Sequence, residues 1–516
     1  MVRIVILGNR LLLVSAIVFA LLSIGSSAYG TDVPQIPVPL PSPTPTPSPE
    51  PAPVPEEADE APTSPTPSED AEETDSAAAT PSETPAAESA EDHVQTPKSE
   101  VVTNPGDVAF TDYAPFDLDE IEPETINTKW GNFVSGLRGI ARYNLFDGML
   151  KFRLGARLQL DGTAGSGNEK YEEFYLPIDA RADVRRLTLF AAGRIQKFNF
   201  NLAFELGPDW GFSDAWIEGS EGGLEVWGKY LGKLRMGFMQ EPFSLERQTS
   251  SFHTGFLERS LPVQTIAPGT NAGVMVHDAG PEGRFTWAVG LFSFGQTKES
   301  NASTSALSLT GRLTYNLVYR NEGRHLVHFG VSASSRSPIG GDTKYRSRPE
   351  ARFVGFLADT GVIDASHLTL VGLEFATVQG PLWVAAEHIR SDVSAQLVGD
   401  PTFKGSYVQV GWFLTGESRP YRINSATWDR GRPAAKFGGG KPFKKGNFGA
   451  LEVVGRASTI DLNDGLIEGG ELTDFSASLN WYLNATTSFR LNYIFARPKN
   501  QGAANIFLLR FQYRPW

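Results

Sequence analysis

Basic side chains alternate with apolar ones in several segments of the chain, and such side chains can bind anions. Between Leu150 and Leu160 every even position is apolar, while the odd positions include Lys151, Arg153 and Arg157. Because successive side chains of a β-strand point to opposite faces, this segment has one apolar face and one cationic face. Arginine offers a planar fork of donors that matches two oxygens of an oxyanion, whereas lysine acts as a point charge. The pattern therefore predicts anion binding on one face of a strand.

Residue types that serve in catalysis show no comparable pattern. His277 and His388 have no nucleophile beside them in a recognisable motif, and we find no phosphate-binding loop, metal-spaced cluster or outstanding carboxylate pair. The chain has no cysteine, which excludes disulfides, thiolate metal sites and cysteine nucleophiles. We therefore expect no enzymatic activity, no metal and no cofactor.

The elements that carry the cations are long alternating strands. Eleven alternating residues are about what a tilted strand needs to cross the hydrocarbon core of a bilayer. The alternation recurs in the segments 198–206, 285–291, 307–319, 475–483, 489–495 and 507–513. In the segment 307–319, Leu307 to Tyr319 form the apolar face at odd positions, opposite Ser308, Thr310 and Arg312. Clusters of Gly, Asn, Asp and Pro separate these segments, and no helical period is sustained.

The predicted fold is an all-β transmembrane antiparallel barrel. The apolar faces are rich in Phe, Trp, Tyr and Leu, as in the aromatic girdles of outer-membrane barrels. Sixteen to eighteen segments qualify as strands, and we choose sixteen because bacterial single-chain barrels have even numbers. A barrel of this width keeps an aqueous channel. A soluble β-sandwich is the alternative fold.

The chain divides into three parts. Residues 1–30 have the basic start, apolar stretch and small residues of a secretory signal peptide, for which a membrane anchor is the alternative. Residues 31–128 hold 20 of the 35 prolines and are predicted to be a disordered, acidic, Pro-rich tail. Residues 129–516 are predicted to form the barrel. Its last strand keeps its phase through Tyr513, but Pro515 interrupts it and Trp516 falls out of register.

The net charge of −13 conceals two parts of opposite sign. Residues 31–128 carry 23 acidic residues and one basic residue, whereas residues 129–516 carry 43 basic and 36 acidic residues. The acidity therefore belongs to the tail, and the predicted barrel has a surplus of seven positive charges. A cationic lumen lined by arginine and lysine offsets the hydration that an anion loses in a narrow pore.

The region from about residue 140 to residue 516 resembles the phosphate-selective porins O and P. The resemblance is carried by Arg235–Glu246, Thr249–Ser251, Phe256–Pro262 and Ala267–Gly269, with support from Asp214–Trp216, Gly411–Glu417 and Asn480–Tyr482. It implies a sixteen-stranded and trimeric porin of the Gram-negative outer membrane, whose basic lumen attracts anions such as phosphate or polyphosphate. It also implies a lysine at the phosphate site, but the block from Gln240 to Thr270 contains none, so a broader anion preference remains open.

The block from Gln240 to Thr270 is too apolar for an exposed connection, with Phe243, Phe252, Phe256 and Leu261 among its residues. It is either a loop folded into the barrel that narrows the pore or an ordered extracellular cap. Arg247 and Arg259 within it serve either anions or ion pairs with Glu241, Glu246 and Glu258. The candidate pore-lining residues are Lys151, Arg153, Arg157, Lys197, Arg235, Arg247, Arg259, Arg312, Arg456, Arg490 and Arg510.

The expected partners follow from this assignment. They are small phosphate-like anions, outer-membrane lipid and two further copies of the chain, with no nucleic acid. The tail is expected in the periplasm, where it acts as a spacer or a solubilising segment. The alternative function is a structural barrel that anchors the tail to the cell wall or to a periplasmic partner. The basic stretch Lys436–Lys445 is either a solvated loop or a site that gathers anions or lipopolysaccharide phosphates.

Overall fold

The computed structural model describes residues 141–145, 149–207, 211–219, 224–226, 229–293, 305–434 and 448–514. The predicted signal peptide, the predicted tail, the basic stretch Lys436–Lys445 and the terminal Trp516 lie outside the described residues. Within the described ranges, no helix is long and apolar enough to cross a membrane.

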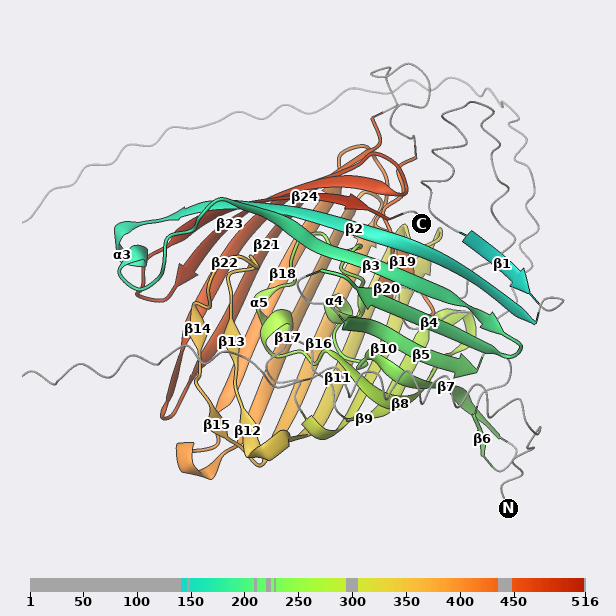
Figure 1. Cartoon of the computed structure of the whole chain (residues 1–516), viewed down its shortest axis with the longest axis horizontal. Coiled ribbons are helices and arrows are strands. Elements are labelled where there is room, and N and C mark those ends of the chain that lie inside the picture. Colours follow the sequence, from blue (N-terminus) through green and yellow to red (C-terminus); the bar gives the residue numbers. More distant parts are fainter. Residues whose placement is uncertain are drawn as a thin grey trace, which may run out of the picture. The chain divides into compact units, whose positions relative to one another are not determined.

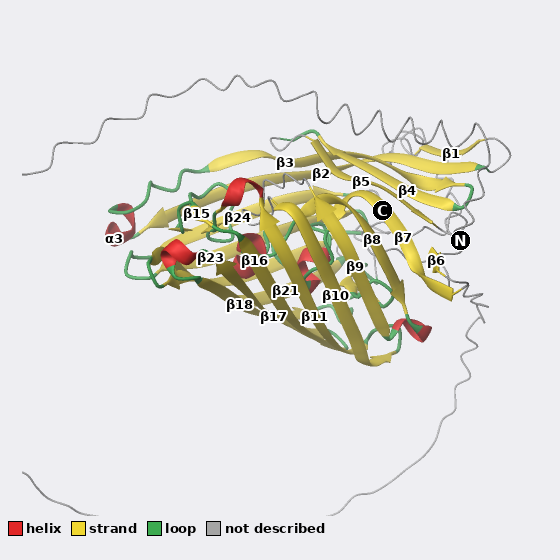
Figure 2. Ribbon diagram, turned by 90° about the horizontal axis from the view of Figure 1, so that it is seen from below, coloured by secondary structure: helices red, strands yellow, loops and turns green. Residues whose placement is uncertain are grey.

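Sixteen of the described strands form one closed antiparallel ring (Figures 1 and 2), which confirms the predicted fold class. The ring closes where β24 (Ala504–Tyr513) pairs with β2 (Leu150–Gly167). The strands between them are β3 (Arg181–Ile195), β4 (Phe198–Glu205), β5 (Gly211–Gly219), β7 (Lys229–Gln240), β8 (Thr270–Ala279), β9 (Phe285–Ser293), β10 (Ser305–Arg320), β11 (His325–Pro338), β16 (His367–Gln379), β17 (Leu382–Ser394), β18 (Thr402–Phe413), β21 (Ala450–Asp464), β22 (Ile467–Tyr482) and β23 (Thr487–Pro498).

Short elements occupy the connections and the edges. Two short strands pair with the ring, β1 (Ala141–Leu145) with β2 and β6 (Leu224–Val226) with β7. Three small hairpin-like pairs lie in the connections: β12 (Asp342–Thr343) with β15 (Ile363–Asp364), β13 (Arg346–Ser347) with β14 (Ala358–Asp359), and β19 (Tyr421–Arg422) with β20 (Thr427–Trp428). The helices are α3 (Glu169–Glu172), α4 (Leu245–Gln248) and α5 (Leu261–Thr265), with 3₁₀ turns η1 (Pro281–Gly283), η3 (Ile339–Gly341) and η4 (Gln396–Val398).

The burial pattern is inverted relative to that of a water-soluble protein. In β10, Leu307 and Leu309 are 54% and 50% exposed, whereas Ser308 and Thr310 between them are 1% and 0% exposed. The same alternation is present in β22, β23 and β24. Apolar side chains that face outward around a closed ring match the apolar band of a transmembrane barrel. The apolar residues of the predicted outer faces are therefore the exposed ones in these strands, with one exception.

The exception is Tyr319, which the alternation placed on the outer face of β10. The pairing of β10 with β11 shifts register between Asn316 and Val318. A bulge of this kind inserts one extra residue, so the residues after it change faces. Tyr319 packs against an interior cluster that contains Leu326, Trp383 and Phe413.

The two ends of the ring differ in the length of their connections. At one end, which we call the loop end, the long segments 168–180, 241–269 and 339–366 connect successive strands. At the other end, the turn end, the connections 196–197, 321–324 and 380–381 are short. The exception is the long connection that follows β18 at the turn end, of which residues 414–434 and 448–449 are described. Transmembrane barrels carry their longer connections on the extracellular side.

Candidate functional site

Two connections from the loop end and one from the turn end fill the interior of the ring. We call residues 241–269 the inner loop, residues 339–366 the second loop, and residues 414–434 the turn-end segment. The inner loop carries α4 and α5, which lie among the strands of the ring in Figure 1. Helix α5 contacts β17, β18 and β21 of the wall, and α4 contacts β20 of the turn-end segment.

The apolar residues of the inner loop account for its inward position. Phe243, Leu245, Phe256 and Leu261 are fully buried. Burying large apolar side chains of this kind stabilises a fold by about 1.5–3 kcal/mol each, relative to leaving them in water. The segment is therefore folded into the barrel, and the alternative of an extracellular cap does not describe it.

Polar groups of the barrel wall satisfy the backbone of the inner loop. The Glu387 carboxylate accepts from the backbone N–H groups of Leu245 and Glu246 at 3.1 and 2.7 Å, at the first turn of α4. The Ser458 hydroxyl accepts from the backbone N–H of Leu261 at 2.9 Å, at the start of α5. First-turn N–H groups have no partner within a helix, so these wall residues fix where the two short helices sit.

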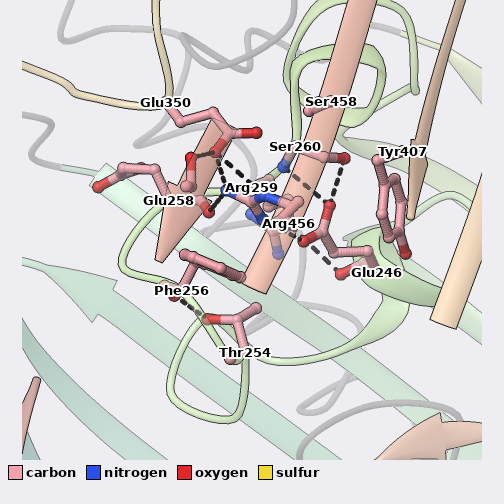
Figure 3. A network of polar contacts seen from close by, with 12 residues as sticks. Glu246, Thr254, Phe256, Glu258, Arg259, Ser260, Glu350, Tyr407, Arg456 and Ser458 are labelled. Carbon is pink, nitrogen blue, oxygen red and sulfur yellow. Dashed lines mark hydrogen bonds and ion pairs between the residues drawn. The ribbon is translucent and has the colours of Figure 1, made fainter. Parts of the chain in front are cut away.

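Arg456 of β21 ties both loop-end segments to the wall (Figure 3). Its Nε donates to Glu350 of the second loop at 3.0 Å, and its Nη1 donates to Glu246 of the inner loop at 3.1 Å. Its Nη2 also donates to the backbone carbonyl of Glu258 at 3.1 Å, and its guanidinium lies 4.1 Å from the centre of the Phe256 ring. Arg456 was a candidate pore-lining cation, and the structure gives it two carboxylate partners.

Three other candidates also bind buried carboxylates of the wall. Arg235 Nε donates to Glu218 at 2.8 Å, and Arg312 Nε donates to Glu374 at 2.9 Å. Arg510 binds Asp161 through Nε and Nη2, both at 2.6 Å, while its Nη1 donates to the backbone carbonyl of Leu257 at 2.8 Å. These ion pairs join strands of the wall to one another, and Arg510 also holds the inner loop.

Other candidates lie against the inner loop or against phenyl rings. Arg490 Nη2 donates to the backbone carbonyl of Phe252 at 2.8 Å, and its Nε and Nη1 atoms have no hydrogen-bond partner among the described residues. Arg157 lies 5.1 and 5.2 Å from the ring centres of Phe190 and Phe252, and Arg153 lies 5.8 Å from that of Phe190. Arginine packed over an aromatic face still offers the N–H donors at its edge to a ligand.

The two lysine candidates lie near the turn end and are exposed. Lys151 is the second residue of β2, and Lys197 lies in the two-residue turn between β3 and β4. Because β4 begins only at Phe198, strand alternation does not place Lys197 in the lumen. The structure therefore gives this residue a position at the rim.

A cavity of about 300 Å³ lies between the inner loop, the second loop and the wall. Its lining contains eight arginines and one carboxylate, that of Glu258, which gives a formal charge of +7. The arginines are Arg185, Arg186, Arg247, Arg259, Arg346, Arg348, Arg352 and Arg510. This charge equals the surplus of residues 129–516, so the rest of that region is formally neutral in sum. The cavity is therefore a strongly cationic part of the lumen.

Of the eight lining arginines, the sequence predicted only Arg247, Arg259 and Arg510. Arg185 and Arg186 are adjacent, so simple alternation would send one of them outward. The pairing of β2 with β3 passes from Gln159–Arg186 to Leu160–Val184, which leaves Arg185 as the extra residue of a bulge. A bulge redirects a side chain, and here both neighbours reach the cavity.

Arg346, Arg348 and Arg352 belong to the second loop, for which the sequence offered no strand pattern. Their close spacing of two and four residues is the sequence feature that could have marked them as a cluster. The guanidinium groups of Arg346 and Arg348 lie 4.2 and 4.3 Å from the centre of the Phe356 ring. This packing holds two like charges against one ring on the cavity wall.

Glu258 and Arg259 are consecutive residues of the inner loop, and both line the cavity. Arg259 donates to the backbone carbonyls of Arg247 and Thr249 at 3.3 and 3.2 Å, which closes the loop on itself. Burial raises the pKa of Glu258, but the nearby Arg185 and Arg510 outweigh burial and lower it to about 2. Glu258 therefore stays ionised at neutral pH. In the described part of the chain, no group of three or more His, Cys, Asp and Glu is placed to hold a metal ion.

Comparison with known proteins gives one family and several relatives. Residues 152–514 match the sequence model of a family described as phosphate-selective porin O and P. Porin O of Pseudomonas aeruginosa is 24% identical over 411 residues, which cover 72% of this chain and 89% of that protein. An uncharacterised protein of Caulobacter vibrioides is 30% identical over 272 residues, 49% of this chain and about half (51%) of that protein. Among solved structures, an anion-selective porin from Comamonas acidovorans matches 70% of this chain and 99% of its own, with 10% identity and a TM-score of 0.40.

Proposed function

Because the chain belongs to the phosphate-selective porin O and P family and is therefore an outer-membrane channel, we propose that it passes small anions by passive diffusion through the arginine-lined cavity. The family consists of channel proteins, which confirms the expectation that the chain is not an enzyme. The observation that carries the proposal is the cavity of eight arginines and one carboxylate inside a closed ring of strands.

The position and charge of the cavity support passage of anions in preference to cations. Fixed cations offset the hydration that an anion loses, and low-dielectric walls focus their field along the lumen. The inner loop and the second loop narrow the lumen at this point, so an ion that crosses the barrel meets the arginines. Oxyanions such as phosphate suit these donors, because two of their oxygens match the fork of one guanidinium.

Other parts of the proposal extend to the assembly and to the ends of the chain. We infer a homotrimer in the outer membrane, with the loop end outside the cell. The acidic segment 31–128 then lies in the periplasm, and residues 1–30 are removed on export. The remaining pore-lining candidates, above all Arg153 and Arg157, are proposed to extend the cationic path from the cavity towards the turn end.

The test is ion selectivity in planar bilayers. Under a salt gradient, the reversal potential of the full-length protein should show preference for anions. The variant Arg346→Gln/Arg348→Gln/Arg352→Gln should lower the anion-to-cation permeability ratio by about an order of magnitude, because it removes three of the cavity's cations. Arg284→Gln is the matched control, since its side chain is 46% exposed and lies in the β8–β9 connection. A channel that prefers cations, or a triple variant as selective as the control, would contradict the proposal.

A further inference from the structure

Glu258 is the one carboxylate in the lining of the arginine cavity, within the part of the chain that the structure describes. Its Oε1 accepts from Arg185 Nε at 2.9 Å, and its Oε2 accepts from Arg185 Nη2 at 3.1 Å. Oε1 also accepts from Arg510 Nη2 at 3.1 Å. A protein carboxylate thus occupies the same kind of two-oxygen site that an oxyanion in the cavity needs.

One of the two arginines that bind Glu258 also binds a carboxylate of the wall. Arg510 is bound through two atoms to Asp161 as well, so its charge is already shared within the wall. The fork of Arg185 faces Glu258, and Arg185 is the bulge residue of β3 that reaches the cavity. An oxyanion that enters the cavity therefore meets Arg185 with its fork already occupied.

The Glu258 carboxylate can leave Arg185 because backbone contacts hold this part of the inner loop in place. The backbone carbonyl of Glu258 is held by Arg456 Nη2 at 3.1 Å, and Ser260, two residues further on, donates its N–H to Glu246 at 2.9 Å (Figure 3). The side chain retains 18% exposure, towards the cavity that it lines. Rotation of the side chain therefore moves the carboxylate without moving the loop.

A pore must bind its ion strongly enough to admit it and weakly enough to release it. Eight arginines around about 300 Å³ would hold a multivalent anion tightly. We propose that Glu258 is a tethered competing anion: it binds Arg185 between transits, yields that site to an entering oxyanion and then takes it back, which speeds release. This inference rests on the proposed function and assigns a specificity-determining role to one residue of the same site.

The experiment measures single-channel conductance of the full-length protein against inorganic phosphate concentration. Glu258→Gln keeps the size of the side chain and an acceptor for Arg185 but removes the charge. We expect the half-saturating phosphate concentration to fall roughly fivefold, as one unit charge a few ångströms from the ion predicts, and the maximal conductance to fall as well. A half-saturating concentration equal to or above that of the wild type would overturn the inference.

Two further experiments test whether the effect of Glu258→Gln depends on its place in the cavity and on Arg185, or follows from the loss of any negative charge. Glu282→Gln removes the same charge from a side chain that is 78% exposed in the β8–β9 connection, and should leave saturation unchanged. In an Arg185→Gln background, Glu258→Gln should lower the half-saturating concentration by a clearly smaller factor, because the fork that Glu258 occupies is absent and only the loss of its charge near Arg510 remains. An equal effect in both backgrounds would overturn the role of Arg185.

A folding defect is controlled with a second substitution. Glu258→Asp keeps the charge but shortens the side chain, so the half-saturating concentration should fall by a smaller factor than with glutamine. If Glu258→Gln does not insert, an unchanged value for Glu258→Asp overturns the inference and a lowered value supports it. The wild-type reversal potential tests the proposed function separately: a selective wild type with unaltered variants refutes only the role of Glu258.

Discussion

Arg456 Nε donates to Glu350 Oε2 at 3.0 Å, and this contact joins the barrel wall to a loop residue that lies 106 positions away in the sequence. The same guanidinium binds Glu246 of the inner loop at 3.1 Å, so one wall arginine holds both segments that line the cavity. Burial raises the pKa of Glu350, and Arg456 opposes that rise. The position of the cavity arginines on the two loops therefore depends on ion pairs whose members are not in the cavity lining.

Arg456→Gln should destabilise the barrel and loosen both loops. It leaves Glu246 and Glu350 buried without their cation, and breaking a buried pair in this way costs about 3–5 kcal/mol. We expect a lower midpoint of unfolding in urea and a noisier, larger conductance. Arg390→Gln is the control, because Arg390 pairs with Asp392 at the surface with 54% of its side chain exposed, and such pairs contribute little. Equal stability of the two variants would contradict the clamping role.

The contact between Glu258 and Arg185 predicts a specific pH dependence. Because the pKa of Glu258 is about 2 in the folded protein against an ordinary value of 4.5, the contact stabilises the folded state above pH 4.5 and loses this effect as the pH falls towards 2. The stability difference between wild type and Glu258→Gln should be constant at neutral pH and shrink below that ordinary value. Urea titrations at several pH values test this, and a difference that grows on acidification would exclude it. Arg185, Arg186 and Arg510 are the charged groups that face this carboxylate.

The barrel was predictable from the sequence because its alternation is dictated locally. Each strand must present apolar side chains to lipid, so Leu307, Leu309 and Leu313 disclose the outer face without any knowledge of their neighbours. The same reasoning failed at Tyr319, where a bulge interrupts the alternation. Strand patterns therefore predict faces as long as the register is regular.

The cavity was only partly predictable, because it is assembled from segments far apart in the sequence. Arg185 reaches the lumen through a bulge in its pairing with β2, and Arg348 does so from a loop whose position depends on Glu350 and Arg456. Alternation also cannot separate cations that pair with acids from those that line the cavity. Arg235 and Arg312 have the inward phase, and both bind carboxylates that no strand pattern identifies as partners.

Replacement by alanine should affect stability differently at two glycines on neighbouring strands. Gly411 pairs with Trp383 across β17 and β18, and a Cβ at this position would overlap the indole ring. Gly411→Ala should destabilise the barrel by about 1–3 kcal/mol, the usual cost of overpacking. For Gly455 of β21, no atom of the described residues lies within 4 Å of such a Cβ, so Gly455→Ala should change stability by less than about 0.5 kcal/mol. Urea midpoints of the two variants provide the comparison, and equal values would show that Trp383 moves aside.

Arg153 and Arg157 test whether the anion path continues towards the turn end. Replacing both with glutamate reverses two charges beside Phe190, where each arginine is 5% exposed. The anion-to-cation permeability ratio should fall by about an order of magnitude, because the focused field of the lumen weakens. Arg284→Glu reverses an exposed charge as a control. If the double variant keeps the wild-type reversal potential, these two residues do not line the path.

Deletion of residues 31–128 distinguishes the proposed channel function from the alternative function, in which the barrel anchors the acidic segment. All cavity residues lie between Arg185 and Arg510, and the sixteen described strands of the ring begin at Leu150. Conductance and anion preference should therefore survive the deletion. A second variant replaces the 23 acidic residues of this segment with their amides and keeps its length. It shows whether an effect of the deletion comes from the charge of the segment or from its length. A deleted protein that inserts but conducts no anions would favour the anchoring role, because the barrel alone would then not suffice for transport.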